Sequence, residues 1–340
     1  MAEADIREGS FTIFGRLDQI AVSQLWPPAA VIQQRVAGFK AATTGKNPEF
    51  KVTTQETSRN VNNATPSRTA IIVAVHRAVH QIIDRPVVFV DPLAMRILSK
   101  AGAQALRHRL EREQERPSGP TRAFIAARSR FAEDILAKAV REGTRQFVLL
   151  GAGLDTFAYR NPYERLTVFE VDHPATQAFK RAELAATGIE APRSLVFVPL
   201  DFSRQPLAAA LAAAGFRHEE PAVFSWLGVT MYLDRAVVLD TLATIASHAA
   251  RGTAIAFDYV VPPATIADAK LRARYELRLA QAPRSDERWR SRFEPWELGV
   301  ALRKAGFARV EDWNPESLNE RYFAGRTQVV PINHLIEAWV

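Results

Sequence analysis

The 340-residue sequence predicts a doubly wound α/β fold that is preceded by a helical region. After Gly143, short β-rich runs alternate with amphipathic stretches, which is typical of βαβ units in a parallel sheet. These β-rich runs are continuously apolar, as expected for strands that helices cover on both faces. Before Gly143 the apolar residues instead recur at helical spacing.

Three helices are expected before the sheet. Ser67 can cap the first helix, and Arg85-Pro86 ends it. A second helix is expected to follow Asp91-Pro92. A third, over residues 121–141, has a stripe of apolar residues along one face. Residues 66–145 are therefore predicted to form a helical lid on an α/β core of residues 146–340, and residues 1–65 a flexible or peripheral extension.

Seven strands and four further helices are expected in the α/β core. β-Branched and aromatic residues mark the strands, and 3.6-residue periodicity marks the helices. The predicted strands are residues 146–151, 167–172, 195–200, 222–227, 253–260, 308–313 and 334–340, and the predicted helices are residues 175–186, 206–214, 235–250 and 295–304.

Composition narrows the class of protein. The sequence contains no cysteine, which excludes thiolate metal ligands, and no metal site is expected. No signal peptide and no apolar run near the roughly 18 residues of a membrane span are recognised, so the expected location is the cytoplasm, without a membrane partner. The formal net charge is +7, with a basic excess over residues 100–145. Over residues 109–113 arginine alternates with glutamate, without interleaved aromatic residues, which favours a solvated helical face over a nucleic-acid site.

A glycine turn follows the first predicted strand. Ligands of doubly wound sheets bind at the carboxyl ends of the strands, and Gly151 and Gly153 allow a backbone to approach a ligand there. A dinucleotide fingerprint requires a third glycine or alanine where this chain has Thr156. The turn therefore favours a cofactor with a smaller, uncharged linkage, such as S-adenosylmethionine, although Gly-x-Gly alone is also an ordinary structural turn.

Two acids end the second predicted strand. Asp172 lies roughly 20 residues after the glycine turn, where an acid can hydrogen-bond ribose hydroxyls. Glu170 points to the same face of a regular strand, and either acid could instead cap the helix that begins near His173-Pro174.

Arg128 and the pair Asp201-Phe202 are further candidates. Arg128 lies on the apolar stripe of its helix, where it must be paired. Its partner could be a cofactor carboxylate, or a protein acid such as Asp155 or Asp134. Asp201 and Phe202 follow the third strand and could contact an adenine, or be a loop acid beside a core phenylalanine.

Seven segments in order resemble the leucine carboxyl methyltransferase family, and the bacterial branch is the most similar. The resemblance covers about residues 66–340. It implies a Rossmann-like class I methyltransferase sheet with S-adenosyl-L-methionine as cofactor. It also implies that Arg128 holds the cofactor carboxylate, Gly151 lies against the methionine portion, Asp172 binds ribose, and Asp201 with Phe202 flanks adenine. The segments are Ser67-Arg68-Thr69-Ala70, Asp91-Pro92-Leu93-Ala94, Ala127-Arg128-Ser129-Arg130-Phe131, Gly151-Ala152-Gly153-Leu154-Asp155-Thr156, Phe169-Glu170-Val171-Asp172, Met231-Tyr232-Leu233 and Arg321-Tyr322-Phe323-Ala324-Gly325-Arg326.

One position departs from the family pattern. Many members have Ala-Glu-Gly before Met-Tyr-Leu, whereas this chain has Trp226-Leu227-Gly228. Leu227 cannot accept a hydrogen bond, so the contact made by that glutamate is missing here.

The predicted reaction is O-methylation of a carboxylate or hydroxyl group on a small acidic metabolite. A carboxylate needs no base, because its pKa of about 4 leaves it ionised at neutral pH. A hydroxyl group would need one, for which Tyr232, His173 and Asp258 lie nearest to the strand ends. The alternatives are a nicotinamide-dependent oxidoreductase on the same fold and a cofactor-binding relative without activity.

Overall fold

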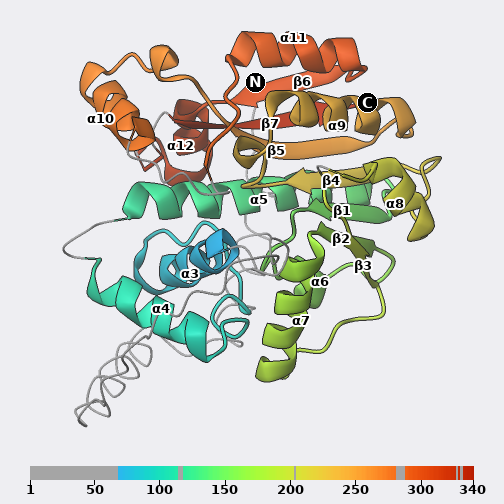
Figure 1. The fold of residues 1–340 in the computed structure, drawn as a ribbon, viewed down its shortest axis with the longest axis horizontal. Coiled ribbons are helices and arrows are strands. Elements are labelled where there is room, and N and C mark those ends of the chain that lie inside the picture. The colour runs from blue at the N-terminus through green and yellow to red at the C-terminus, as the bar shows by residue number, and fades with distance from the viewer. Residues whose placement is uncertain (1–67, 114–117, 203, 281–287, 327, 330–331) are drawn as a thin grey trace, which may run out of the picture. The chain divides into compact units, whose positions relative to one another are not determined.

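The computed structural model describes residues 68–340 except 114–117, 203, 281–287, 327 and 330–331 (Figure 1). The predicted extension, residues 1–65, and the predicted cap Ser67 lie outside the described residues. Within the described part of the chain, no helix is both long and apolar enough to span a membrane.

A seven-stranded sheet forms the centre of the fold, in the order β3-β2-β1-β4-β5-β7-β6. The first five strands along the chain pair in parallel, while β7 pairs antiparallel with both β5 and β6. The chain reverses its direction of winding between the neighbours β1 and β4, which confirms the doubly wound fold. All seven predicted strands are present: β1 Gln146–Leu150, β2 Thr167–Asp172, β3 Leu195–Pro199, β4 Ala222–Trp226, β5 Ala254–Val260, β6 Arg309–Trp313 and β7 Asn333–Trp339.

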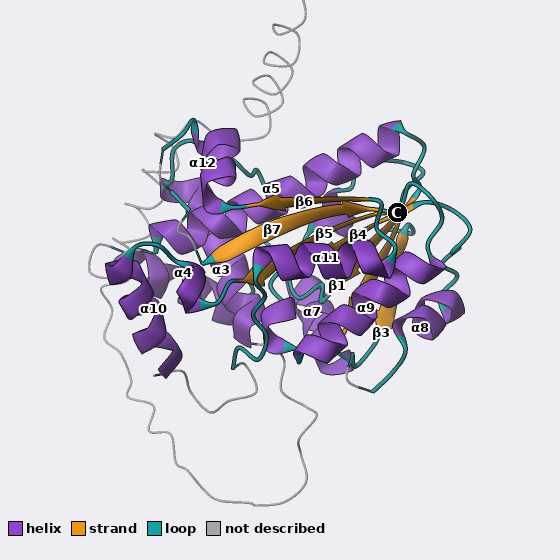
Figure 2. Ribbon diagram, turned by 90° about the horizontal axis from the view of Figure 1, so that it is seen from above, coloured by secondary structure: helices purple, strands orange, loops and turns teal. Residues whose placement is uncertain are grey.

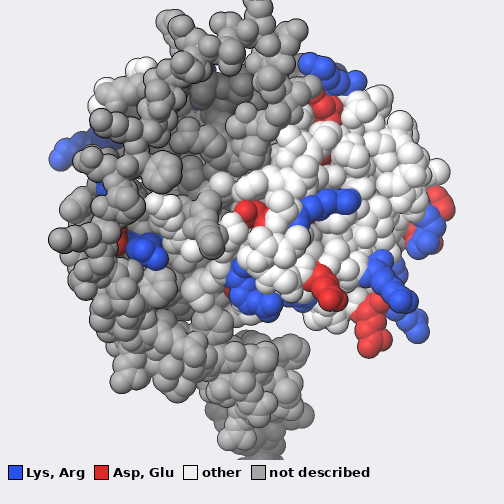
Figure 3. Space-filling model, turned by 60° about the horizontal axis from the view of Figure 1, so that its bottom comes forward, with Lys and Arg blue, Asp and Glu red and all other residues white. Residues whose placement is uncertain are grey.

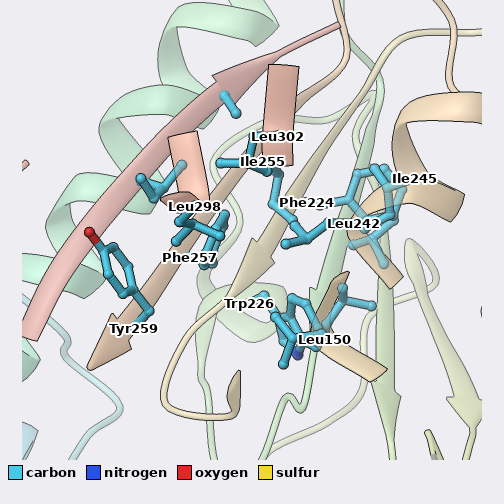
Figure 4. Close-up of a cluster of buried hydrophobic side chains, with 14 of the residues drawn as sticks. Leu150, Phe224, Trp226, Leu242, Ile245, Ile255, Phe257, Tyr259, Leu298 and Leu302 are labelled. Atoms are coloured by element: carbon cyan, nitrogen blue, oxygen red, sulfur yellow. The ribbon is translucent and has the colours of Figure 1, made fainter. Parts of the chain in front are cut away.

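Helices cover both faces of the sheet (Figure 2). Apolar residues of α5 and α12 pack on one face. Apolar residues of α8, α9 and α11 pack on the other, where they meet the large side chains of β4 and β5 (Figure 4). The helices are α3 Arg68–Ile83, α4 Lys100–Glu111, α5 Gly119–Arg141, α6 Phe157–Arg160, α7 Pro174–Thr187, α8 Leu207–Ala213, α9 Arg235–His248, α10 Ala269–Ala280, α11 Pro295–Ala305 and α12 Pro315–Phe323.

The second helix begins later than the sequence predicts. Residues 92–97 form turns, and α4 starts only at Lys100. Asp91 accepts a hydrogen bond from Leu93 N and lies within ion-pair distance of Arg77 and Arg160, which fixes the chain here without a helix. The prediction of a helix directly after Asp91-Pro92 is therefore wrong in its starting point.

Helix α5, the last of the three leading helices, joins α3 to the sheet. The helix contacts α3 as well as β4, β5 and β7. The predicted apolar stripe is confirmed, since Phe124, Phe131, Ile135 and Ala139 are all buried.

The face of β5 that lies under α5 carries unusually small side chains. Ala254 and Ala256 belong to the same apolar cluster as the buried residues of α5, while Ile255 and Phe257 belong to the cluster on the opposite face. The alternation is that expected of a strand, whose successive side chains point to opposite faces. Small residues under α5 allow the helix to lie close to β5.

Enlarging this contact should separate the helix from the sheet. Ala256 is 0% exposed, so Ala256→Leu should lower the free energy of unfolding by about 1–3 kcal/mol through overpacking. Val300→Leu, on an exposed position of α11, is the matched control and should change it by less than about 0.5 kcal/mol. Urea denaturation of both variants measures the difference, and equal effects would contradict close packing at Ala256.

Candidate functional site

The turn between β1 and α6 requires glycine at its first position. Gly151 has a φ of +69°, and a Cβ there would lie 2.4 Å from Cγ2 of Val229. The turn is tied to the neighbouring strand, because Gly151 N and Ala152 N donate to the carbonyl oxygen of Val171. Gly153 follows with a φ of +47°. The backbone is therefore held in a shape that only glycine accommodates easily.

Asp172 is hydrogen-bonded to this turn from the end of β2. Its Oδ2 accepts from Gly153 N at 2.6 Å, and its Oδ1 accepts from His173 N at 2.7 Å. Burial raises the pKa of Asp172, although these two hydrogen bonds act in the opposite direction. The capping role belongs to His173, whose Nδ1 accepts from Ala175 N at the start of α7. Asp172 thus joins the carboxyl ends of β1 and β2.

Glu170 has a different environment from Asp172. Its carboxylate is 2.8 Å from Nζ of Lys180 on α7, and both side chains are 1% exposed. Burial raises the pKa of Glu170 to about 7, with Lys180 opposing the shift. Because Glu170 is enclosed with its own cation, Asp172 is the acid available at the strand end.

Arg128 is paired with an acid that the sequence analysis did not consider as its partner. Its Nη1 donates to Oδ2 of Asp258 at 2.8 Å, and its side chain is 8% exposed. The suggested partners Asp155 and Asp134 are wrong. Asp155 lies near Arg77, and Asp134 accepts from side chains that include Arg130.

The loop after β4 packs against this ion pair. Gly228 N donates to Oδ1 of Asp258 at 2.5 Å. Gly228 has a φ of +73°, and a Cβ there would lie 2.7 Å from Nη2 of Arg128. The guanidinium group therefore lies directly against the backbone of this loop, at the carboxyl end of β4.

Phe202 reaches towards the same region from the end of β3. Its ring stacks on that of Trp226, the last residue of β4, with 6.0 Å between centroids and 28° between planes. The two strands are separated by β2 and β1. Asp201 pairs with the exposed Arg204 at 3.3 Å. The predicted residues at the ends of β1 and β2, and Phe202 from the end of β3, thus lie along one edge of the sheet.

Tyr232 follows this edge in the short 3₁₀ helix Thr230–Tyr232. Its side chain is half-buried against the cluster under α9 and α11. Of the other two base candidates, His173 caps α7 and Asp258 pairs with Arg128, so both are engaged in structural contacts.

A second layer of charges behind the glycine turn was missed by the sequence analysis. Nη2 of Arg77 donates to the carbonyl oxygen of Leu154 at 2.5 Å, and Oδ1 of Asp155 accepts from Phe157 N. Arg160 pairs with Glu133 on α5. The helical spacing of Arg77 on α3 was the only signal, and it did not reveal which turn the side chain would meet. Among the described residues, no group of three or more His, Asp or Glu side chains could hold a metal ion.

Comparison with known proteins identifies similar sequences. The family model described as leucine carboxyl methyltransferase matches residues 70–246. The Bacillus subtilis protein YktD, named as a candidate S-adenosyl-L-methionine-dependent methyltransferase, is 31% identical over 286 residues, which cover 76% of this chain and 92% of YktD. A Mycolicibacterium gilvum protein with a similar name is 35% identical over 56% of this chain and 73% of its own length.

Solved structures are more distant. Magnesium protoporphyrin IX methyltransferase of Synechocystis, solved with S-adenosylhomocysteine, is 12% identical and has a TM-score of 0.43, covering 71% of this chain and 95% of that one.

The contact between Gly151 and Val229 can be tested through stability. Gly151→Ala should lower the free energy of unfolding by about 2–4 kcal/mol, because it adds a clash to the strain of a left-handed backbone. Gly188→Ala is the matched control, since its φ is +65° and nothing lies within 4 Å of its Cβ position, and it should cost about 1–2 kcal/mol. Adding Val229→Ala should recover part of the loss only in the Gly151 variant. Recovery in neither variant would rule out the clash.

Proposed function

Because the chain belongs to the leucine carboxyl methyltransferase family, we propose that it transfers the methyl group of S-adenosyl-L-methionine to an oxygen atom of a small acidic metabolite. The observation that carries the proposal is the convergence of the glycine turn, Asp172 and the Arg128 guanidinium group at the carboxyl edge of the sheet. This edge, at the β1 and β4 switch point, is where doubly wound folds bind their ligands. Membership of this family also argues against the alternative function of a nicotinamide-dependent oxidoreductase.

The residues at the edge suit the parts of this cofactor. The Gly151 turn lets a thioether and ribose lie against the backbone, and Gly153 N fixes the carboxylate of Asp172 beside it. We assign Asp172 to the ribose hydroxyls. We assign Asp201 and Phe202 to adenine, for which the Phe202–Trp226 stack offers an aromatic wall.

Arg128 suits the carboxylate of the methionine portion. A guanidinium group has five N–H donors, and Asp258 takes one of them. Within the described part of the chain, no acceptor is found for its Nε or Nη2, so these remain for an external carboxylate.

The acceptor is assigned from the family and from the chemistry of methyl transfer. The enzyme has chiefly to align the acceptor oxygen with the methyl group and the sulfur atom. The family description names a carboxyl group, and a carboxylate would need no base. The net positive charge gives less support to an acidic acceptor, because Arg109, Arg122 and Arg130 of the helical region pair with acids. Lys and Arg are also interspersed with Asp and Glu on the face shown in Figure 3.

Two ligands separate the predicted contacts. S-adenosylhomocysteine carries the amino-acid group, whereas 5′-methylthioadenosine keeps adenine, ribose and the thioether but lacks that group. Arg128→Ala should lower the affinity for S-adenosylhomocysteine by about tenfold to a hundredfold, because a charge-assisted hydrogen bond is lost. The affinity for 5′-methylthioadenosine should stay unchanged. Asp172→Asn should lower the affinity for both ligands. Isothermal titration calorimetry measures the affinities.

The exposed residue Arg309, at the far edge of the sheet, provides the control variant Arg309→Ala. Wild-type protein that binds NADH but not S-adenosylhomocysteine would contradict the proposed cofactor. Unchanged affinities in the Arg128 and Asp172 variants would contradict the assigned site.

The acceptor class can be tested by pH dependence. A screen of carboxylic acids and phenols, followed by release of S-adenosylhomocysteine, should find turnover with a carboxylic acid. For such an acceptor kcat/KM should be flat between about pH 6 and 8, because the carboxylate is already ionised. A rate that rises with pH, and that Tyr232→Phe reduces by about 10²–10⁴-fold, would instead indicate a hydroxyl acceptor with Tyr232 as base. Tight cofactor binding without turnover of any acceptor would favour an inactive relative.

A further inference from the structure

Two periodic patterns bring Arg128 and Asp258 together. Along β5, Ala254, Ala256 and Asp258 lie on the face beneath α5, because alternate residues of a strand share a face. Along α5, Arg128 is one turn from Phe124 and lies on the same buried side. The two alanines let the helix approach, and the next residue of their stripe is the acid.

Asp258 restrains the guanidinium group from one side and the loop from the other. The acid is 0% exposed, and each of its carboxylate oxygens accepts one hydrogen bond, from Arg128 Nη1 and from Gly228 N respectively. The backbone of Gly228 then lies against the guanidinium group, where a Cβ would be 2.7 Å from Nη2. Arg128 is thus enclosed by β5 and by the loop after β4, with its remaining donors fixed in direction.

We propose that Asp258 is a positioning residue, which holds Arg128 in the orientation that receives the carboxylate of the cofactor. The inference rests on the proposed function, because it needs a cofactor with such a carboxylate. Leu227 directly follows Trp226, which pairs with Phe257 in the last β4–β5 pair, and its side chain has no polar atom. Asp258 therefore supplies the negative charge that Arg128 requires at this point of the sheet.

Removing the charge of Asp258 should affect only ligands that carry the amino-acid group. In Asp258→Asn, the amide has one acceptor and one donor group, so it cannot accept from both Arg128 and Gly228 N. The affinity for S-adenosylhomocysteine should fall by about tenfold to a hundredfold, while that for 5′-methylthioadenosine should stay unchanged. Calorimetry with both ligands makes the comparison, and binding of methylthioadenosine shows that the variant is folded.

Thr230→Val is the matched control. The Thr230 hydroxyl donates to the backbone oxygen of Asp258 at 2.6 Å, so this variant disturbs the same segment without altering the carboxylate. This variant should not change the ratio of the affinities for S-adenosylhomocysteine and 5′-methylthioadenosine. Should Asp258→Asn fail to fold, Gly228→Ala displaces the guanidinium group from the opposite side and should give the same selective loss.

A double variant tests whether Asp258 acts through Arg128. Adding Asp258→Asn to Arg128→Ala should cause no further loss of S-adenosylhomocysteine affinity, because residues of one unit are not additive. An additive loss, an equal loss for both ligands, or tighter binding by Asp258→Asn would each overturn the inference. In these cases the wild type still binds both ligands and the proposed function stands. A wild type that binds neither ligand overturns both.

Discussion

The buried ion pair between Arg128 and Asp258 is the contact on which the arrangement of the site depends. It joins α5, which precedes the sheet in sequence, to the end of β5, 130 residues later. Removing one partner of a buried pair costs about 3–5 kcal/mol, because the other charge is left without compensation. The pair therefore fixes the helix over the strands at the level of the carboxyl edge of the sheet.

The rest of the edge is held by contacts of the same kind, in which a side chain from one strand end bonds the backbone after another. Asp172 of β2 accepts from the turn after β1, and Asp258 of β5 accepts from the loop after β4. Both loops carry a glycine with positive φ against a neighbouring side chain, Val229 at Gly151 and Arg128 at Gly228. The two strands at the switch point thus end in backbone turns that adjacent acids hold in place.

The sequence predicts the sheet well, because its information there is local. The first five strands are largely apolar runs between turn residues, and all seven predicted strands agree with the structure to within one residue at either end. Short α6 and α12 were missed, since four and nine residues give too little periodicity, although Asn314-Pro315 supplies a cap and a first-turn proline for α12. Helix α10 was missed because its apolar residues alternate with charged ones over residues 270–279, which is the spacing of a strand rather than of a helix.

The partners of the charged residues could not be predicted, because pairing depends on distances across the fold rather than along the chain. Arg128 was correctly placed on a buried stripe, yet helical spacing says nothing about which strand lies beneath it, and Asp258 was considered only as a base. In retrospect the stripe of Ala254, Ala256 and Asp258 carries the missing information. The two small residues let α5 lie close to β5, and the acid that follows them on the same face meets the cation of that helix. The buried Asp258 at the end of this stripe is therefore better explained by its partner Arg128 on the covering helix than by proton transfer.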